Sequence, residues 1–439
     1  SGGMVIGTVS EGFCNYLKRE QNMAYTETRE IQNPNWWSRM GGAVKGMAVG
    51  AVLFLIAFPI LFWNEGRAVK TAQGLSEGAE AVVSVGADKV DSANEGKLVH
   101  VSGKADTKET LSDAAFGVSA TALRLARSVE VYQWVEHKNV TREKKGDKTI
   151  EKTTYTYSKE WCSQPVDSSA FKEAGHGNPP MAMPFSDQVQ IAKDVTLGAF
   201  RLTERHVKRI GGSKAFPFAQ DFKLPETQQG GQFLNGDIFI AAPASVTTPA
   251  AGAQNSAFPL QAAAQAVSNA VTSAVRQIAS NPLVGDIRVR FRVVEPHDIS
   301  ICEKQVGDTL AAWTASNKKT ISLQEDGIHD AEAMFASAQS ANTMMTWILR
   351  LVGFLVMLFG VRMVLAPLSV LVDVIPVVRT VVSMGVGLIA FLISAVCSLS
   401  VIAVAWFFYR PLLSITLIAL ATALVVALVV LKKKKAAAV

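Results

Sequence analysis

WILRLVGFLVMLFGVRMVLA, residues 347–366, is an apolar run broken only by Arg350 and Arg362 near its ends. Two further runs follow: Thr380–Tyr409 carries no charge, and Leu412–Leu431 consists mainly of Leu, Ile, Val and Ala. Each run has the roughly 20 residues that a helix needs to cross a hydrocarbon core of about 30 Å. A soluble domain has no need of three such runs, so this part of the chain predicts transmembrane helices.

A fourth apolar run, Gly46–Trp63, lies near the N-terminus. It begins well inside the chain and ends in the aromatic pair Phe62-Trp63, which favours a retained membrane anchor over a signal peptide. Apolar residues continue at helical spacing beyond Trp63, so we expect the helix to extend past the membrane. The predicted fold class is a multi-span α-helical membrane protein with four transmembrane helices. A large α+β, β-rich extracytoplasmic domain is inserted between helices one and two.

The orientation follows from the lysines at 432–435, because clustered lysines beside a span favour the cytoplasmic side. Four spans then return the N-terminus to the cytoplasm, in agreement with Arg39 and Lys45 before the first span. The middle domain is therefore expected in the periplasm or in a lumen. The net charge of +6 comes partly from the lysine tail. No basic stripe is interleaved with stacking aromatics, so we expect the lipid bilayer as a partner and no nucleic acid.

These boundaries divide the chain into eight parts. They are a cytoplasmic N-terminal arm (1–45), helix one (46–63), the extracytoplasmic domain (64–343) with an Ala-rich insert (243–282), helix two (344–366), an apolar cytoplasmic-side loop (367–380), helix three (381–408), helix four (411–431) and a basic cytoplasmic tail (432–439).

Alternating apolar and polar residues predict strands in the middle domain. Leu123–Glu136 and Thr153–Trp161 both alternate, and the charged segment His137–Glu151 between them predicts a long hairpin with a solvated tip. Ile287–Val293 alternates in the same way. The turn Glu295-Pro296-His297 after it predicts a second hairpin.

Arg288, Arg290 and Arg292 form a row on the polar face of that strand. The row could be an anion or lipid-headgroup site, but the salt-bridged face of a strand is the favoured interpretation. Cys162 and Cys302 are the two cysteines expected in the outer domain. A disulfide between them is compatible with an oxidising compartment, although the sequence does not show that they meet.

The strong catalytic signatures are absent from the sequence. There is no phosphate-binding GxxxxGK[ST], no HExxH and no dinucleotide fingerprint after a strand. The segment 74–78 has the letters of a GxSxG nucleophile elbow but lies in a helical stretch without the strand that the elbow needs. His176 is the one histidine in a turn dense enough to suggest a site, and a structural role is favoured for it. We expect Arg350 and Arg362 to extend toward the two membrane interfaces. No catalytic residue, cofactor or metal ion is predicted.

Seven blocks occur in order along the chain: FWNEGRAVKTA (62–72), NEGKLVH (94–100), VEVYQWVE (129–136), YTYSKEW (155–161), GHGNP (175–179), LVDVIPVVR (371–379) and WFFYRP (406–411). These blocks resemble the LUMA family of transmembrane proteins. Within them we take the following as structural or interaction residues: Asn64, Glu65, Gly66, Arg67, Asn94, Glu95, Gly96, Tyr132, Trp134, Trp161, His176, Asn178, Pro179, Asp373, Pro376, Arg379, Tyr409, Arg410 and Pro411.

The resemblance implies four spans, both ends in the cytoplasm and a large lumenal domain. It also implies self-association, a place in the endoplasmic reticulum and inner nuclear membrane, and binding to envelope proteins such as emerin and lamins, with no accepted enzymatic activity. The Ala- and Val-rich composition also suits a bacterial member of the family. Its domain would be periplasmic, its spans would lie in the inner membrane, and lamins would not be partners.

Three hypotheses for the function follow. The first is a non-enzymatic, self-associating membrane organiser or scaffold whose outer domain mediates assembly or partner binding. The second is an ion channel or a channel-modulating subunit. The third is a lipid-modifying enzyme with a site near His176 or at the membrane face.

Overall fold

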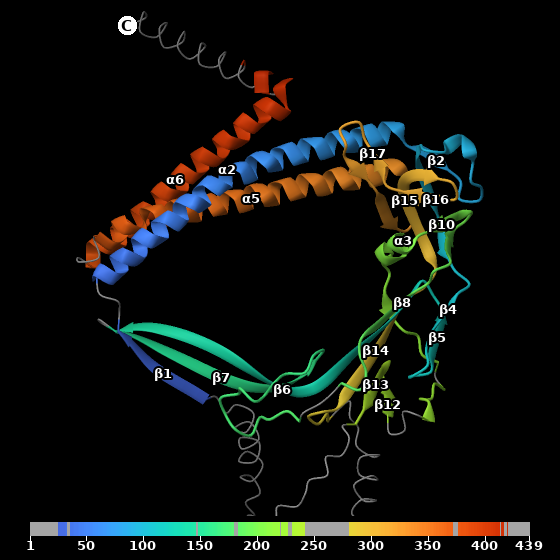
Figure 1. Ribbon diagram of the computed structural model, residues 1–439, viewed down its shortest axis with the longest axis horizontal. Coiled ribbons are helices and arrows are strands. Elements are labelled where there is room, and N and C mark those ends of the chain that lie inside the picture. Colours follow the sequence, from blue (N-terminus) through green and yellow to red (C-terminus); the bar gives the residue numbers. More distant parts are fainter. Residues whose placement is uncertain are drawn as a thin grey trace, which may run out of the picture. The chain divides into compact units, whose positions relative to one another are not determined.

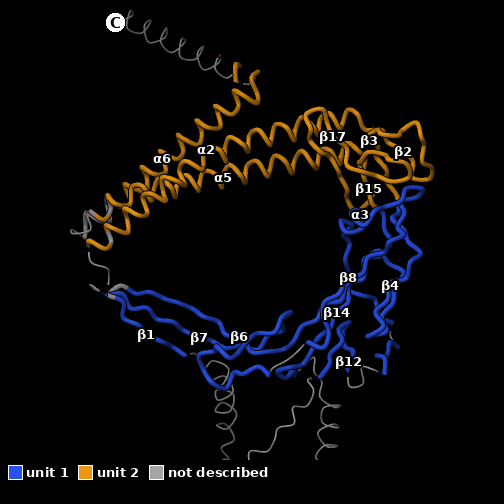
Figure 2. The backbone as a smooth tube through the Cα atoms, viewed as in Figure 1, with its two compact units in different colours: residues 1–33, 104–298 blue, residues 34–103, 299–439 orange. Residues whose placement is uncertain are grey.

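A computed structural model describes most of the chain. The described residues are 25–32, 36–145, 148–179, 183–219, 221–226, 231–241, 281–371, 376–412, 414–416 and 419. The fourth predicted span, the Ala-rich insert and the lysine tail lie largely or wholly outside these ranges. The chain forms two compact units (Figure 2). One contains residues 1–33 and 104–298, and the other contains residues 34–103 and 299–439.

Three helices of the second unit are long and apolar enough to cross a membrane. They are α2 (Trp36–Ala81), α5 (Ala331–Leu371) and α6 (Pro376–Tyr409), which run side by side (Figure 1). Helix α2 continues to Ala81, which confirms the predicted extension beyond the first span. Large apolar side chains cover much of the outer surface of the helices, as expected for surfaces that face lipid.

Small residues bring α2 and α5 together. A Cβ added to Gly50 would lie 2.7 Å from the carbonyl oxygen of Gly360, and a Cβ added to Gly360 would lie 2.7 Å from the backbone nitrogen of Phe54. Any larger side chain at Gly360 would therefore separate the two backbones. Further along the bundle, Leu61 packs with Met357 and Val401 in an apolar core that contains residues of all three helices.

A small β-rich region of the second unit packs on the ends of α2 and α5. Its elements are β2 (Val83–Val85), η1 (Ser92–Asn94), β3 (Leu98–Asp106), β15 (His297–Val306), β16 (Thr309–Ala311), β17 (Trp313–Thr314), β18 (Thr320–Ile321) and β19 (Leu323–Asp326). Leu75 of α2, Phe335 of α5 and Leu98 of β3 share one buried cluster with Cys302. The two helices and these strands therefore fold around a common core.

The first unit is dominated by an eight-stranded sheet, whose main path is β1-β7-β6-β14-β13-β12. The elements of this unit are β1 (Tyr25–Gln32), β4 (Thr110–Asp113), β5 (Val118–Thr121), β6 (Arg124–Lys145), β7 (Lys148–Cys162), β8 (Gln188–Ile191), β9 (Val195–Leu197), β10 (Phe200–Leu202), α3 (Glu204–Arg209), β11 (Lys214–Ala215), β12 (Gly231–Leu234), β13 (Asp237–Ile240) and β14 (Ile287–Val294). The apolar face predicted for β6 is confirmed, because Leu125, Val129 and Val131 are buried.

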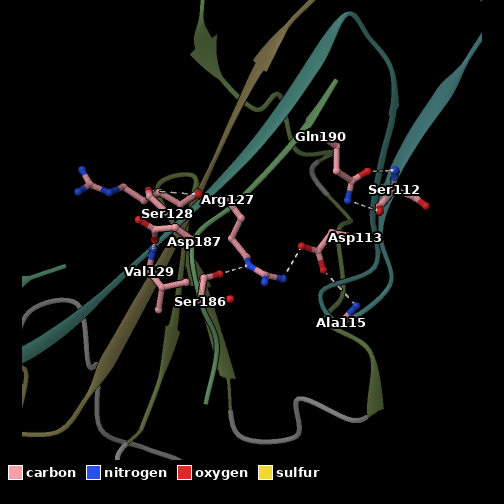
Figure 3. Close-up of polar contacts among 10 residues, drawn as sticks. Ser112, Asp113, Ala115, Arg127, Ser128, Val129, Ser186, Asp187 and Gln190 are labelled. Atoms are coloured by element: carbon pink, nitrogen blue, oxygen red, sulfur yellow. Dashed lines mark hydrogen bonds and ion pairs between the residues drawn. The ribbon is translucent and has the colours of Figure 1, made fainter. Parts of the chain in front are cut away.

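A buried ion pair fixes the start of β6 in this unit (Figure 3). Arg127 Nη1 lies 2.5 Å from Asp113 Oδ2, and Arg127 Nε donates to the carbonyl oxygen of Ser186 at 3.0 Å. The side chains of Arg127 and Asp113 are only 10% and 4% exposed. Asp187 accepts from the backbone nitrogen of Val129 at 2.8 Å, so the loop before β8 is attached at two points.

Two sequence-based expectations are wrong in detail. The segment His137–Glu151 is not a loop, because β6 and β7 remain paired as far as Lys145 and Lys148. Cross-strand pairs such as Arg142–Glu151, at 2.6 Å, stabilise the charged ladder.

The predicted hairpin at Glu295–His297 does not form, because β14 pairs with β6 and β13 whereas β15 pairs with β3, β16 and β19. Pro296 lacks the N–H that a continuing ladder needs, and the chain changes sheets there.

The N-terminal arm, for which the sequence predicts a cytoplasmic location, contains the strand β1. This strand pairs antiparallel with β7 from Tyr25↔Tyr155 to Gln32↔Lys148. A strand ladder requires both segments in one compartment. The pairing therefore conflicts with an arm in the cytoplasm and a β-rich domain on the other side of the membrane.

Candidate functional site

The segment Asn64-Glu65-Gly66-Arg67 forms a polar joint among the three long helices. Glu65, on α2, is completely buried. Arg350 of α5 donates from Nε to Glu65 Oε1 at 2.7 Å and from Nη2 to Oε2 at 2.9 Å. Trp406 of α6 donates from Nε1 to the same Oε2 at 2.9 Å. One carboxylate thus binds side chains of both other helices.

The geometry of this ion pair favours stability. The guanidinium meets the carboxylate with two parallel hydrogen bonds, the geometry that compensates best for the lost hydration of a buried pair. The guanidinium also lies 4.7 Å from the ring centroid of Trp347 and 5.8 Å from that of Trp406. Arg350 therefore has a partner inside the bundle, Glu65, and its extension toward a membrane interface stays a prediction.

A second layer of hydrogen bonds surrounds Arg67, two residues further along α2. Arg67 Nη1 donates to Asn342 Oδ1 at 3.1 Å, and Nη2 donates to Asn64 Oδ1 at 3.2 Å and to Thr346 Oγ1 at 3.1 Å. Asn342 Nδ2 donates in turn to the carbonyl oxygen of Ala68 at 3.0 Å. The partners of Arg67 are neutral, so they satisfy its hydrogen bonds without balancing its charge.

Gly66 and Tyr409 complete the joint. A Cβ added to Gly66 would lie 2.6 Å from Cζ of Tyr409, so only glycine lets the ring lie against α2. The Tyr409 ring also contacts Phe62, with centroids 5.3 Å apart. After α6, the backbone nitrogen of Arg410 donates to the carbonyl oxygen of Trp406, and Pro411 follows. The first and last family blocks therefore meet in space.

The sequence analysis missed several members of this joint. Gln339, Asn342, Thr346 and Arg350 are spaced by three or four residues along α5, and each reaches α2. A polar stripe of this spacing in an apolar helix could have indicated a buried contact. The partner of each side chain could not be read from the pattern.

Asn94, Glu95 and Gly96 form a turn before β3. Glu95 Oε2 accepts from the backbone nitrogen of Gly307 at 2.9 Å, and the Gly96 nitrogen donates to the carbonyl oxygen of Gln305 at 3.0 Å. Gly96 has φ +75°, which favours glycine. This block is a structural turn that attaches the start of β3 to β15.

Another group of predicted residues forms an aromatic cluster in the first unit. The His176 ring stacks on Tyr157 at 4.0 Å and meets Trp134 edge-on at 4.6 Å. Asn178 accepts from the Trp134 nitrogen at 2.7 Å and donates to the Trp134 carbonyl oxygen at 3.0 Å. Tyr132 and Trp161 pair across β6 and β7, with ring centroids 5.2 Å apart. Pro179 lines a surface pocket beside Asn178.

The chemistry of this cluster is that of a packed loop. Tyr157 donates its hydroxyl to Glu136 Oε2 at 2.7 Å, and burial together with this bond raises the pKa of Tyr157 to about 12. The phenol therefore stays protonated at neutral pH. Nδ1 of His176 is buried and has no hydrogen-bond partner among the described residues. Because the imidazole stacks on one aromatic ring and meets a second edge-on, the arrangement gives little support to a catalytic role.

The arginine row on β14 makes ordinary structural contacts. Glu130 binds Arg288 at 2.5 Å and Arg290 at 2.6 Å, so the interpretation of the arginine row as a salt-bridged strand face is confirmed for these two residues. Arg292 donates to the carbonyl oxygen of Ser213 at 2.7 Å.

Cys162 and Cys302 are both free thiols, so the disulfide that the sequence allowed is not formed. Burial, the largest cause, raises the pKa of the Cys302 thiol to about 12.

Asp373 lies outside the described residues, and Pro376 and Arg379 belong to the first turns of α6. Within the described ranges, no group of three or more His, Cys, Asp or Glu side chains could hold a metal ion.

Comparisons with known proteins agree with these blocks. A family model described as "Transmembrane protein 43" matches residues 131–411. Transmembrane protein 43 of Mus musculus is 32% identical over 413 residues, which cover 91% of this chain and 93% of the mouse protein. The Homo sapiens protein is 31% identical, and the alignment covers 93% of this chain and 95% of the human protein. The Drosophila melanogaster homolog is 28% identical, and the alignment covers 84% of this chain and 90% of the homolog. No solved structure matches the chain. The chain therefore belongs to the transmembrane protein 43 family, also called LUMA.

Proposed function

We propose that this protein is a non-enzymatic organiser of the membrane, which self-associates through its helices and uses its β-rich domain for assembly or partner binding. The observation that carries the proposal is that both oxygens of the Glu65 carboxylate already accept hydrogen bonds from the protein. Both carboxylate oxygens are bound by side chains of α5 and α6, so this completely buried carboxylate serves as a structural clamp. A catalytic carboxylate would need a free oxygen that faces a substrate.

The exposed surfaces of the helices support self-association. Met384, Leu388 and Leu392 of α6 are exposed, and side chains added at Gly385 or Gly387 would meet no atom of the described residues within 4 Å. Small residues on an open apolar face let a second helix approach closely. We infer that neighbours on this face are further copies of the chain, with other membrane or envelope proteins as additional partners.

The alternatives receive less support from the same unit. A pore through one copy would need polar side chains along the bundle axis, whereas Ala57, Leu61, Met357 and Val401 pack there as an apolar core. A lipid-modifying enzyme would need a reactive group near the membrane. The His176 ring is instead packed between Trp134 and Tyr157.

We further propose that the C-terminal lysines lie in the cytoplasm and the β-rich domain on the opposite side. This side would be the periplasm in a bacterium and the lumen of the endoplasmic reticulum or nuclear envelope in a eukaryote. For the N-terminal arm, two observations compete. Arg39 and Lys45 favour the cytoplasm, and the β1–β7 ladder favours the side of the domain. A disulfide trap across that ladder distinguishes them.

The mass of the particle tests self-association. Full-length protein is reconstituted into lipid nanodiscs over a tenfold range of lipid-to-protein ratio and weighed by mass photometry, with a known monomeric membrane protein as control. A discrete oligomer that persists on dilution is expected. Gly387→Leu should reduce its share, whereas Gly42→Leu, at another open helix position, should not. A particle that is monomeric at every ratio would refute the organiser proposal.

A further inference from the structure

A cationic pocket lies directly beside the polar joint, in the same unit. It has a volume of about 360 Å³ and is lined by α2 between Trp63 and Thr71, by the turn Asn317–Lys319 and by Tyr409. Arg67, Lys70, Lys318 and Lys319 are its four basic residues, and its described lining contains no carboxylate. Four positive charges around a space of this size favour an anion.

The turn that carries two of these lysines is fixed to α2. Asn317 Nδ2 donates to the carbonyl oxygen of Lys70 at 2.7 Å. The backbone nitrogen and the hydroxyl of Ser316 both donate to the Glu77 carboxylate, at 2.9 and 2.6 Å. Lys318 adopts φ +64°, which is uncommon for a residue with a side chain. The turn is therefore a built feature that holds its lysines at the helix.

The helix residues of the pocket have polar atoms without partners. Among the described residues, no partner binds Nε of Arg67 or Oγ1 of Thr71, although both atoms are buried. Buried polar groups without hydrogen bonds destabilise a structure, so they indicate a site for a ligand or for ordered water. Since the guanidinium of Arg67 has only neutral partners in the joint, an anion would also balance its charge.

The position of the pocket identifies the kind of anion. Trp63 is 62% exposed and follows the first apolar run, where aromatic side chains mark the headgroup level of a bilayer. Deeper along α2 and α6 lies an apolar groove of about 450 Å³, lined by Phe58, Pro59, Phe62 and Val404 among others. Phe62 of the groove contacts Tyr409 of the cationic pocket. A cationic pocket next to an apolar groove suits a molecule with an anionic head and an acyl chain.

We propose that the pocket binds the phosphate headgroup of an anionic phospholipid from the leaflet on the side of the β-rich domain, with an acyl chain along the groove between α2 and α6. Arg67, Lys70, Lys318 and Lys319 supply the charge, and Thr71 supplies a hydroxyl. The site does not depend on self-association, because all its residues belong to one copy.

Lipid binding to the full chain tests the proposal. Protein purified in a neutral detergent is titrated with fluorescent phosphatidylglycerol and with phosphatidylcholine of the same chain length. Phosphatidylglycerol should bind at least tenfold more tightly. Lys318→Gln/Lys319→Gln should reduce the affinity for phosphatidylglycerol roughly 10- to 30-fold, as expected for two cations at a membrane surface. The matched control is Lys89→Gln/Lys97→Gln, which removes the same charge from exposed positions of the same unit and should change little.

Two further results decide the nature of the ligand. Glycerophosphoglycerol, the headgroup without acyl chains, should not displace the lipid at equal concentration. If it binds as tightly as the lipid, the site recognises a soluble phosphate compound and the lipid assignment is wrong. Equal binding of the two lipids, or equal losses in the pocket and control variants, would refute the site itself.

Discussion

Replacement of Glu65 by glutamine tests the joint at its centre. The substitution keeps the size of the side chain and removes its charge, so that Arg350 loses the carboxylate that now accepts from Nε and Nη2. The new amide group would also place an N–H donor against one of three existing donors. Loss of one partner from a buried pair costs about 3–5 kcal/mol. Because Arg350 is 15% exposed and water can reach it, we expect the lower end, about 3 kcal/mol.

Thermal unfolding in mild detergent, followed by intrinsic fluorescence, measures this effect. Glu65→Gln should lower Tm by roughly 5 °C. The double variant Glu65→Gln/Arg350→Met should recover more than half of the loss, because replacement of a whole buried pair by neutral residues is often tolerated. A Tm unchanged by Glu65→Gln would refute the clamp. A double variant less stable than Glu65→Gln alone would show that the two side chains act independently.

Three other predictions follow from the packing. Gly360→Leu should lower Tm by several degrees, because its side chain would meet the α2 backbone. Gly42→Leu, at an open position of α2, should change Tm little, and equal effects of the two substitutions would contradict the close approach of α2 and α5. Asp113→Asn breaks the buried ion pair shown in Figure 3 and should destabilise the first unit by about 2–3 kcal/mol. The loss should appear as faster proteolysis within this unit. An unchanged proteolysis rate would exclude a structural role for the ion pair. Thr28 and Lys152 are partners across β1 and β7, so the double variant Thr28→Cys/Lys152→Cys should form a disulfide under mild oxidation in detergent. If no disulfide forms there, the β1–β7 ladder is refuted. If the disulfide forms in intact membranes, the N-terminal arm lies on the same side of the membrane as the β-rich domain.

Local patterns were sufficient for the long elements. Uninterrupted apolar sequence predicted the helices that became α2, α5 and α6, and alternation predicted β6, β7 and β14. These signals succeed because a membrane or a sheet face imposes burial on every residue of a segment. They fail where the partner lies far along the chain. Position 296 looks like a hairpin turn, yet the strands on its two sides belong to different sheets.

The contacts of the polar joint could not be predicted from local sequence patterns for the same reason. The sequence identified Asn64, Glu65, Gly66 and Arg67 as a block, but their partners on α5 lie 275 to 285 residues away. The charge of Arg350 near the end of a span is compatible with an extended side chain or with a buried ion pair. Only the packing of α2 against α5 decides between them.

Arg67 belongs both to the polar joint and to the cationic pocket. Binding of an anion in the pocket would therefore change the stability of the joint. Its Nη atoms bind Asn342, Asn64 and Thr346, and its Nε remains without a partner beside the pocket. An anion bound in the pocket would balance the charge of Arg67 and so stabilise the contacts between α2 and α5. A ligand that binds only the folded joint raises stability by RT ln(1 + [L]/Kd), about 2.7 kcal/mol at a concentration of 100 Kd. That value is similar to the cost expected for Glu65→Gln. The lipid composition of the membrane would therefore influence how firmly the helices of this protein hold together.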